Sequence, residues 1–223
     1  MIMKNQIPQI ILASSSAYRR ELLSRLVKIF DTSSPDIDES ILSNEKPLGY
    51  VSRLALEKVQ AVAGSGRNGL IIGSDQTAVT DNGILGKPGG FDRAVEQLTQ
   101  CSGKEVRFLT GLALLDTESQ RAEVEVDEVI VRFRHLTSIE IENYLLAEEP
   151  YDCAGSFKCE GLGISLFESI QSSDPNSLVG LPLIRLNKML IRFGLNPLLH
   201  LHSKSFASSA RAHWIGEVTD NPS

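Results

Sequence analysis

A carboxylate follows a short apolar run in the first half of the chain. Residues 70–72 are Leu-Ile-Ile, and Gly73, Ser74 and Asp75 come directly after them. Such a run is typical of a buried strand, and ligands in open α/β sheets bind at the carboxyl ends of strands. A carboxylate placed there is costly unless a metal ion, a cation or hydrogen bonds compensate its charge. We therefore expect Asp75 to take part in chemistry at the end of a strand; a carboxylate that only caps a turn is the alternative.

Basic side chains open the first predicted helix. Tyr18, Arg19 and Arg20 occupy the first turn of a helix expected over residues 17–26. The first turn usually carries acidic residues, which complement the positive end of the helix. Two arginines add to that positive end and so suit a bound polyphosphate, while a solvated basic turn is the alternative.

Two lysines are predicted to approach Asp75. Lys58 falls in the middle of the apolar face of a helix expected over residues 47–63. Its ammonium must therefore either reach solvent or meet a fixed anion, and we favour the anion. Lys87 follows the hairpin signal Asp81-Asn82-Gly83, which would return the chain to the neighbourhood of Asp75.

An acidic run and a glycine-rich stretch could also contribute to a site. Asp36, Asp38 and Glu39 are close in sequence and could supply oxygen ligands for Mg²⁺ or Mn²⁺. Taken alone, such a run is more often a solvated loop. Residues 153–163 are rich in glycine and contain Glu160. Glycine permits close approach of the backbone to a ligand, but the pattern is common.

The elements that must position these residues alternate as in an α/β protein. We expect strands at residues 10–13, 28–33, 70–73 (with β-structure continued at 77–80), 106–112, 122–133 and 164–167. We expect helices at residues 17–26, 47–63, 91–101, 139–147 and 181–193. The alternation of apolar residues slips at Asp127-Glu128, which predicts a β-bulge. Thr137 and Glu140 form the signature of a capping box.

Composition and charge exclude several classes of protein. The 223 residues suit one domain, with or without a lobe, and 22 basic against 28 acidic side chains give a net charge of −6. This net negative charge argues against binding of duplex nucleic acid. A small anionic substrate would need a local cluster of Lys and Arg side chains. Residues 1–9 lack the apolar core of a signal peptide, and no apolar run approaches membrane-spanning length. We expect a cytoplasmic protein.

The cysteines argue against a covalent or metal-bound framework. Cys101, Cys153 and Cys159 make an odd number and have no Cys-x-x-Cys spacing. We therefore expect neither a disulfide framework nor a structural zinc site.

Taken in order, these blocks resemble the Maf family of nucleoside triphosphate pyrophosphatases. The N-terminal signature is the run Ile-Leu-Ala-Ser-Ser-Ser-Ala-Tyr-Arg-Arg at residues 11–20. The other matching blocks are Asp38-Glu39, Arg53-Leu54-Ala55 with Glu57-Lys58, Gly73-Ser74-Asp75, Gly86-Lys87-Pro88, Thr110-Gly111 and Gly180-Leu181-Pro182-Leu183. Thr110-Gly111 could approach a ligand or serve packing. The resemblance covers about residues 9–198.

Within that family the chain is most similar to the 7-methyl-GTP pyrophosphatase subgroup. Gln76 after the aspartate, residues 153–161 and residues 174–176 carry the similarity. Two residues depart from the subgroup pattern. Tyr18 stands where tryptophan is more frequent, and Cys159 stands where serine is more frequent.

The resemblance implies a fold and a domain organisation. The fold would be α/β, with a mixed, strongly twisted β-sheet flanked by helices and a ligand cleft between two lobes, as in Maf and inosine-triphosphatase-like proteins. Residues 1–198 would form the Maf-like domain, and residues 199–223 would be a tail outside the family pattern. The partners implied are a nucleoside triphosphate substrate, neither nucleic acid nor membrane, and a possible homodimer.

The resemblance also implies a reaction and its residues. Water would attack the α-phosphorus of a nucleoside triphosphate and release a nucleoside monophosphate and pyrophosphate. Asp75 would be the general base, and Glu39 and Asp75 would hold a divalent cation, Mg²⁺ or Mn²⁺. The residues implied to bind the triphosphate are Ser14, Arg19, Arg20, Lys58 and Lys87.

Base selection would depend on three further residues. N7-methylated guanine carries a positive ring charge, which the aromatic face of Tyr18 would attract. Glu160 would accept hydrogen bonds from the guanine edge, and Gln76 would complete the pocket. The alternatives are the same chemistry on dTTP or UTP, or a nucleotide-binding regulator of septum formation without catalysis.

Overall fold

The computed structural model describes residues 8–200 of the chain, so most of the predicted tail lies outside the described residues. The strands are β1 (Ile10–Ala13), β2 (Asp31–Thr32), β3 (Leu70–Thr80), β4 (Gly83–Leu85), β5 (Glu105–Asp116), β6 (Arg121–Phe133) and β7 (Phe167–Ser172). The α-helices are α1 (Ala17–Leu26), α2 (Pro47–Gly64), α3 (Phe91–Cys101), α4 (Ser138–Glu148), α5 (Leu183–Arg192) and α6 (Pro197–His200). Short 3₁₀ helices are η1 (Ala154–Ser156), η2 (Leu162–Leu166) and η3 (Ser177–Val179).

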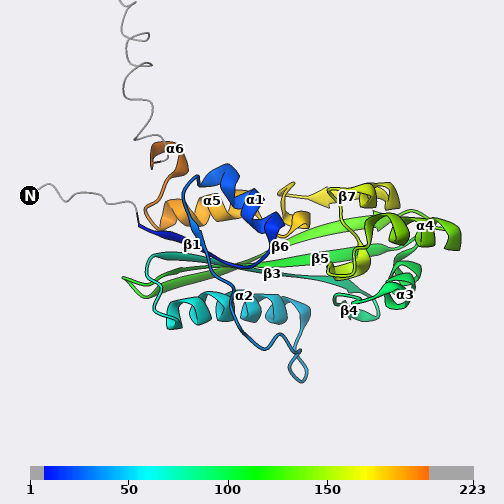
Figure 1. Cartoon of the computed structure of the whole chain (residues 1–223), viewed down its shortest axis with the longest axis horizontal. Helices are drawn as coiled ribbons and strands as arrows, with labels where there is room; N and C mark the ends of the chain where they lie inside the picture. The colour runs from blue at the N-terminus through cyan, green and yellow to red at the C-terminus, as the bar shows by residue number, and fades with distance from the viewer. Residues whose placement is uncertain (1–7, 201–223) are drawn as a thin grey trace, which may run out of the picture.

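The strands form one mixed sheet of seven, which confirms the predicted α/β class. Its order is β2-β1-β3-β5-β6-β7, and β4 pairs with β3 as a hairpin. Strand β1 is parallel to β2 and β3, and the remaining pairs are antiparallel. Helices α1 and α5 cover one face of the sheet and α2 covers the other (Figure 1). The homodimer stays a prediction.

Local signals explain where the helices begin. The Oγ of Ser16 accepts a hydrogen bond from the backbone N–H of Arg19 and caps α1. Helix α2 begins with Pro47, which has no N–H to leave unsatisfied at this position. Thr137 and Glu140 form the predicted capping box of α4. Among residues 8–200, no helix combines the length and apolar composition needed to cross a bilayer.

The hydrophobic core lies in two parts of the molecule. Near β1 and β3, Leu23 of α1 and Leu186 of α5 pack with Ile72 of the sheet, and Val59 of α2 packs with Ile71. At the opposite end of the sheet, a separate cluster around Phe108 packs with α3 and α4. The two parts lie toward opposite ends of the long axis in Figure 1, as the predicted two-lobe arrangement requires.

Two glycines allow α2 to lie close to the sheet. A Cβ atom on Gly73 would lie 2.6 Å from the carbonyl oxygen of Ala55, and one on Gly111 would lie 2.1 Å from that of Val51. Gly111 pairs with Asp75 across β5 and β3. Gly111 of the block Thr110-Gly111 therefore serves packing, and the close packing brings the face of α2 that carries Lys58 against Asp75.

Replacing Gly111 with alanine is expected to destabilise the fold by about 1–3 kcal/mol, because the added methyl group would clash with a backbone oxygen that cannot rotate away. The matched control is Gly64→Ala at the end of α2, where a Cβ would meet nothing within 4 Å. That change should be neutral or stabilising. Urea unfolding of both variants checks the prediction, which would be wrong if Gly111→Ala were as stable as Gly64→Ala.

The structure corrects the predicted place of Asp75. The residue lies inside the 11-residue strand β3, because antiparallel pairing with β5 continues from Leu70 to Val79. The parallel partner β1 ends at Ala13, which pairs with Gly73. Asp75 thus follows the end of the parallel pairing, although it does not follow the end of its strand.

Two other predicted strand features were wrong, and a third was right over only two residues. There is no bulge at Asp127-Glu128, since β5 and β6 pair without a register shift and Asp127 takes a fully buried position in the alternation. Residues 164–167 lie mostly in the 3₁₀ helix η2, and the strand begins only at Phe167. The strand expected at residues 28–33 is limited to β2.

Candidate active site

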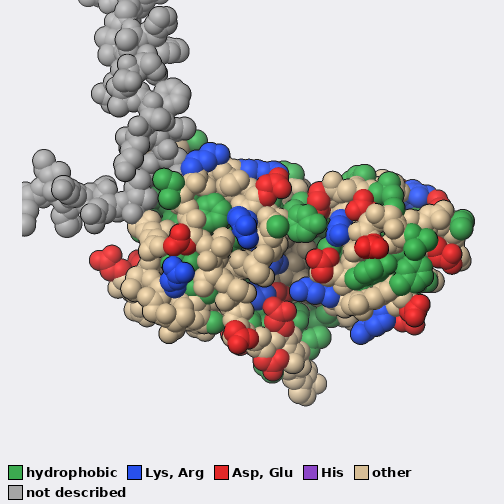
Figure 2. Space-filling view, viewed as in Figure 1, with side chains coloured by type: hydrophobic (Ala, Val, Ile, Leu, Met, Phe, Trp, Pro, Cys, Tyr) green, Lys and Arg blue, Asp and Glu red, His purple; other side chains and the backbone are tan. Residues whose placement is uncertain are grey.

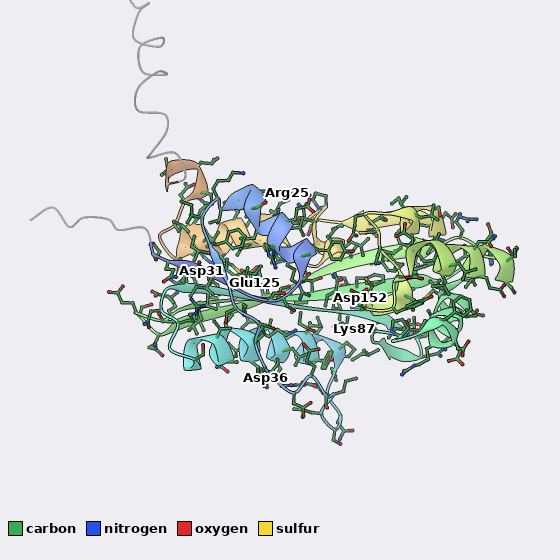
Figure 3. The ribbon with its side chains drawn as sticks, in the orientation of Figure 1. Arg25, Asp31, Asp36, Lys87, Glu125 and Asp152 are labelled. Carbon is green, nitrogen blue, oxygen red and sulfur yellow. The ribbon has the colours of Figure 1, made fainter. Side chains whose placement is uncertain are left out.

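A cavity of about 630 Å³ lies between the two parts of the core. Its walls come from the start of α1, the loop before α2 and α2 itself, the middle of β3, the segment after β4, the loop at residues 152–160, and η3. Figure 2 shows this face hollowed near its middle, where acidic and basic side chains gather. Lys87 and Asp152, from two of these walls, lie near the middle of the long axis in Figure 3.

A buried lysine joins two carboxylates in this cavity. The Nζ atom of Lys58 lies 2.5 Å from Oδ1 of Asp75 and 2.8 Å from Oε1 of Glu39. Lys58 is 6% exposed and Asp75 is 7% exposed, whereas Glu39 is exposed. The prediction that Lys58 meets a fixed anion is confirmed. The periodicity of apolar residues in α2 predicts that Lys58 lies on the buried face. The carboxylates of Asp75 and Glu39 there accept hydrogen bonds from its ammonium group.

Electrostatics keep Glu39 ionised. Desolvation raises the pKa of Glu39. The hydrogen bond from Lys58 and the positive charges of Lys58, Lys87 and Arg19 lower it by more, so the pKa is lowered overall. The hydroxyl of Tyr50 donates a hydrogen bond to the backbone carbonyl of Glu39 at 2.9 Å. Tyr50 therefore helps to hold the acidic loop over the cavity. The sequence offered no signal for this contact.

Arg19 and Ser14 lie at the floor of the cavity. The Nε of Arg19 donates to the carbonyl oxygen of Gly180 at 2.9 Å, which fixes the guanidinium through its Nε. Burial lowers the pKa of Arg19, and the charges of Asp75 and Glu39 oppose that shift. Ser14 is buried, and its Oγ accepts a hydrogen bond from the N–H of Ser16 at 3.1 Å. Both residues line the cavity, as does Ser16, which sequence reasoning missed.

The structure does not bring Arg20 into the cavity. Its side chain is exposed on α1 and is not part of the cavity wall. Successive residues of a helix point about 100° apart, and on α1 Tyr18 and Arg19 line the cavity while Arg20 lies on the exposed side. A role of Arg20 toward the triphosphate therefore rests on the resemblance alone.

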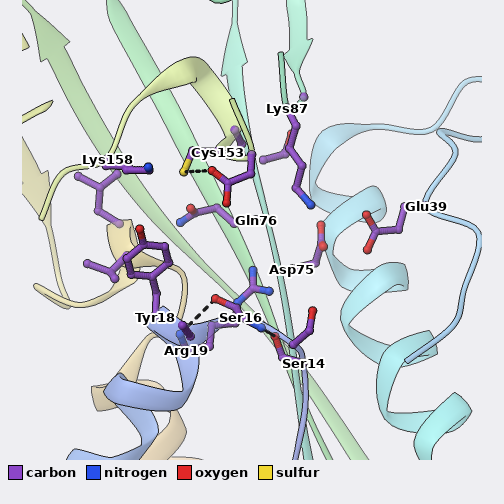
Figure 4. Close-up of a pocket in the computed structure, with 18 of the residues that line it drawn as sticks. Ser14, Ser16, Tyr18, Arg19, Glu39, Asp75, Gln76, Lys87, Cys153 and Lys158 are labelled. Carbon is purple, nitrogen blue, oxygen red and sulfur yellow. Dashed lines mark hydrogen bonds between the residues drawn. The ribbon is translucent and has the colours of Figure 1, made fainter. Parts of the chain in front are cut away.

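The other end of the cavity is aromatic. Figure 4 shows Tyr18 and Lys158 on one side and Asp75, Glu39 and Lys87 on the other, with Gln76 between them. Burial raises the pKa of Tyr18; the charge of Lys158 opposes this shift, and that of Glu160 adds to it. Tyr18 and Glu160 both line the cavity, and their roles in base selection stay a prediction. Lys158, unassigned from sequence, donates its Nζ to the carbonyl of Glu148 at 2.9 Å.

The cysteines of the cavity wall are inert thiols. Burial raises the pKa of both Cys153 and Cys159 to about 12, and their hydrogen bonds to Asp152 and Glu160 act in the same direction. Neither residue is therefore an activated nucleophile at neutral pH. Within residues 8–200, no group of three or more His, Cys, Asp or Glu side chains could hold a metal ion by itself.

Comparisons with known proteins find close relatives in sequence. A protein named 7-methyl-GTP pyrophosphatase from Pseudomonas syringae pv. syringae is 55% identical over 189 residues, covering 85% of this chain and 98% of that protein. Proteins of the same name from Pseudomonas savastanoi pv. phaseolicola and Idiomarina loihiensis are 57% and 54% identical, each over 85% of this chain and over 98% and 96% of their own length.

Among solved structures, the Ham1 protein of Staphylococcus aureus aligns with a TM-score of 0.49 at 13% identity, over 83% of this chain and 99% of that chain. At that level the alignment assigns no residue. The family described as Maf-like protein matches residues 9–193, which include every cavity residue discussed above. The chain belongs to the Maf family.

Proposed function

We propose that the protein is a nucleoside triphosphate pyrophosphatase that hydrolyses 7-methyl-GTP to 7-methyl-GMP and pyrophosphate. The observation that carries the proposal is the two-ended cavity. One end combines a carboxylate with several cations, and the other combines an aromatic face with hydrogen-bond acceptors. The names of the related proteins support the same substrate. Such an enzyme would remove the modified nucleotide from the cytoplasmic pool.

Asp75 is the proposed general base. Its Oδ1 accepts the hydrogen bond of Lys58, which fixes the carboxylate and leaves Oδ2 to accept a proton from water. The water oxygen forms a bond to the α-phosphorus as the bond from that phosphorus to the bridging oxygen breaks. The bridging oxygen leaves with the β- and γ-phosphates as pyrophosphate.

The triphosphate binds to cations from three elements. Lys58 of α2, Lys87 after β4 and Arg19 of α1 line the same cavity. Because its Nε is held by the carbonyl of Gly180, Arg19 presents its two terminal nitrogens to a phosphate in the fork geometry that suits bidentate binding. Ser14 adds a hydroxyl at the floor. The cluster explains how a chain of net charge −6 can bind a polyanion.

The two carboxylates fit a divalent cation. Asp75 and Glu39 come from different parts of the chain and already share one cation, the ammonium of Lys58. Mg²⁺ is commonly bound by one or two carboxylates together with substrate phosphates, so the absence of a third protein ligand within residues 8–200 suits this mode. When bound, Mg²⁺ or Mn²⁺ would neutralise the charge of the phosphates.

Base selection follows from the aromatic end. Tyr18 offers its ring to the positively charged imidazole of N7-methylguanine. Glu160, exposed at the cavity rim, accepts from the N–H groups of the guanine edge, and Gln76 lies between the base and phosphate ends. The runner-up substrates, dTTP and UTP, lack both the ring charge and this pattern of donors. A regulator without catalysis would not need Asp75 beside a cation cluster.

A panel of nucleotides assayed for pyrophosphate release tests the proposal. With Mg²⁺ or Mn²⁺, we expect 7-methyl-GTP to be hydrolysed better than GTP, dTTP or UTP. Loss of the methyl group removes the ring charge, and the corresponding loss for GTP should be roughly two- to thirtyfold in kcat/KM. Chelation with EDTA should abolish turnover, and added metal should restore it.

Variants assign the selectivity to its residues. Glu160→Gln should reduce turnover of 7-methyl-GTP more than that of UTP, whereas Glu118→Gln, at an exposed turn outside the cavity wall, should change neither. Tyr18→Ala should reduce 7-methyl-GTP turnover selectively, and Tyr18→Trp should preserve it. If dTTP or UTP were the best substrate and Glu160→Gln affected every nucleotide equally, the proposed base preference would be wrong.

A further inference from the structure

The amide of Gln76 is held in one orientation by groups beneath the cavity. Its Nε2 donates to the carbonyl oxygen of Ser177 at 2.7 Å and to Oγ1 of Thr110 at 2.8 Å. A carbonyl can only accept, so a flipped amide would place two acceptor oxygens in contact. The hydroxyl of Thr110 itself donates to the same carbonyl at 3.2 Å, which leaves its oxygen to accept from Gln76. Both N–H groups of the amide are thus used, and Oε1 is the atom left for a ligand.

The carbonyl that orients Gln76 belongs to Ser177, whose side chain is itself hydrogen-bonded to strand β6. Ser177 is fully buried and begins the single turn η3, and its Oγ donates to Oδ2 of Asp127 at 2.5 Å. The other oxygen of Asp127 accepts from the Nε of Arg185 at 2.5 Å and from the hydroxyl of Ser173 at 3.2 Å. Asp127 therefore connects α5 and two serines of the loop that precedes it.

Asp127 occupies a position where an apolar residue would be expected. It lies on β6 opposite Thr110 of β5, in phase with the buried residues Val129 and Val131, and it is 0% exposed. A buried carboxylate is costly even when it is paired, and hydrophobic residues could replace such a pair without loss of stability. Stability alone therefore does not explain its presence. Its hydrogen bond from the Oγ of Ser177 links it to the residue whose carbonyl orients Gln76.

We propose that Asp127 is a positioning residue for base recognition, which acts through Ser177 to hold the Gln76 amide with its Oε1 toward the base. An oriented acceptor at this point matches the N–H donors of guanine. The proposal rests on the proposed function, because it specifies how the same cavity selects its nucleotide.

Ser177→Ala tests the proposal, with Ser173→Ala as the matched control. Both serines donate to Asp127, but only the carbonyl of Ser177 contacts Gln76. We expect Ser177→Ala to reduce the ratio of kcat/KM for 7-methyl-GTP to that for UTP by about three- to tenfold, the effect of losing one hydrogen bond. Ser173→Ala should leave the ratio unchanged. Equal ratios for wild type and Ser177→Ala would overturn the proposal.

Repeating the test in a Gln76→Ala variant distinguishes a positioning role of Ser177 from a general effect on the structure. In Gln76→Ala protein, Ser177→Ala should not change the ratio further, because the residue through which it acts is gone. A further drop of the same size would overturn the proposal.

Should Ser177→Ala not fold, Thr110→Val removes the other contact with Gln76, and Thr110→Ser should restore the ratio. If wild type itself does not prefer 7-methyl-GTP, the proposed function fails; if wild type prefers it and the variants keep the ratio, only this inference fails.

Discussion

Replacing Asp75 with asparagine is expected to abolish nearly all turnover while the protein still folds. Asparagine has the shape of aspartate, and its amide oxygen can still accept the hydrogen bond of Lys58. It cannot accept a proton from water, and it removes one charge from the proposed cation site. Loss of a general base typically costs ~10²–10⁴-fold in rate.

Turnover should be measured as pyrophosphate release from 7-methyl-GTP at saturating metal, beside circular dichroism and thermal unfolding. Asp38→Asn is the matched control, since Asp38 belongs to the acidic run but does not line the main cavity. It should retain activity. An Asp75→Asn variant within about threefold of wild type would remove Asp75 from the mechanism, because that effect is far below the range for a general base.

Elements with local signals were predictable almost to the residue. The helix beginning at Ala17 follows the Ser16 cap, and the helix beginning at Pro47 follows the preference of proline for the first turn. The hairpin between β3 and β4 follows its Asn-Gly turn. These features depend on residues that are close together in the sequence, so they can be predicted without knowing the tertiary structure.

Features set by contacts distant in sequence were not predictable in the same way. Asp127 looked like a break in alternation, because its partners Ser177 and Arg185 are 50 and 58 residues away. The 3₁₀ helix η2 replaced a predicted strand at a place where Leu162 donates its backbone N–H to the side chain of Glu148. For the same reason, only part of the candidate site could be predicted from the sequence. Lys58 could be placed by periodicity, but neither Tyr50 nor Lys158 could be connected to the cavity without the fold.

Replacing Lys58 with methionine is expected to remove activity and to lower stability together. Sequence alone argues for unchanged or higher stability, since an apolar chain of similar length would replace a desolvated charge. The structure reverses that expectation, because Lys58 is the partner of Asp75, which is only 7% exposed. Removing one member of a buried ion pair typically costs about 3–5 kcal/mol, since the remaining charge stays buried without compensation.

Lys87→Met is the matched control for this change. Lys87 lines the same cavity but is exposed. Both variants should lose activity toward 7-methyl-GTP through weaker triphosphate binding, yet only Lys58→Met should show a lower free energy of unfolding in urea. A Lys58→Met protein as stable as Lys87→Met would mean that the ion pair with Asp75 contributes nothing net to the fold.

The double variant Lys58→Met/Asp75→Asn identifies the origin of the loss. If the instability of Lys58→Met comes from the uncompensated carboxylate, then neutralising Asp75 should restore a large part of the lost stability. Activity should not return, because the general base is then also absent. Equal instability of the single and double variants would instead assign the loss to the packing of the methionine side chain against β3. The stability of the pair and its role in catalysis are thus separable, although the same two side chains carry both.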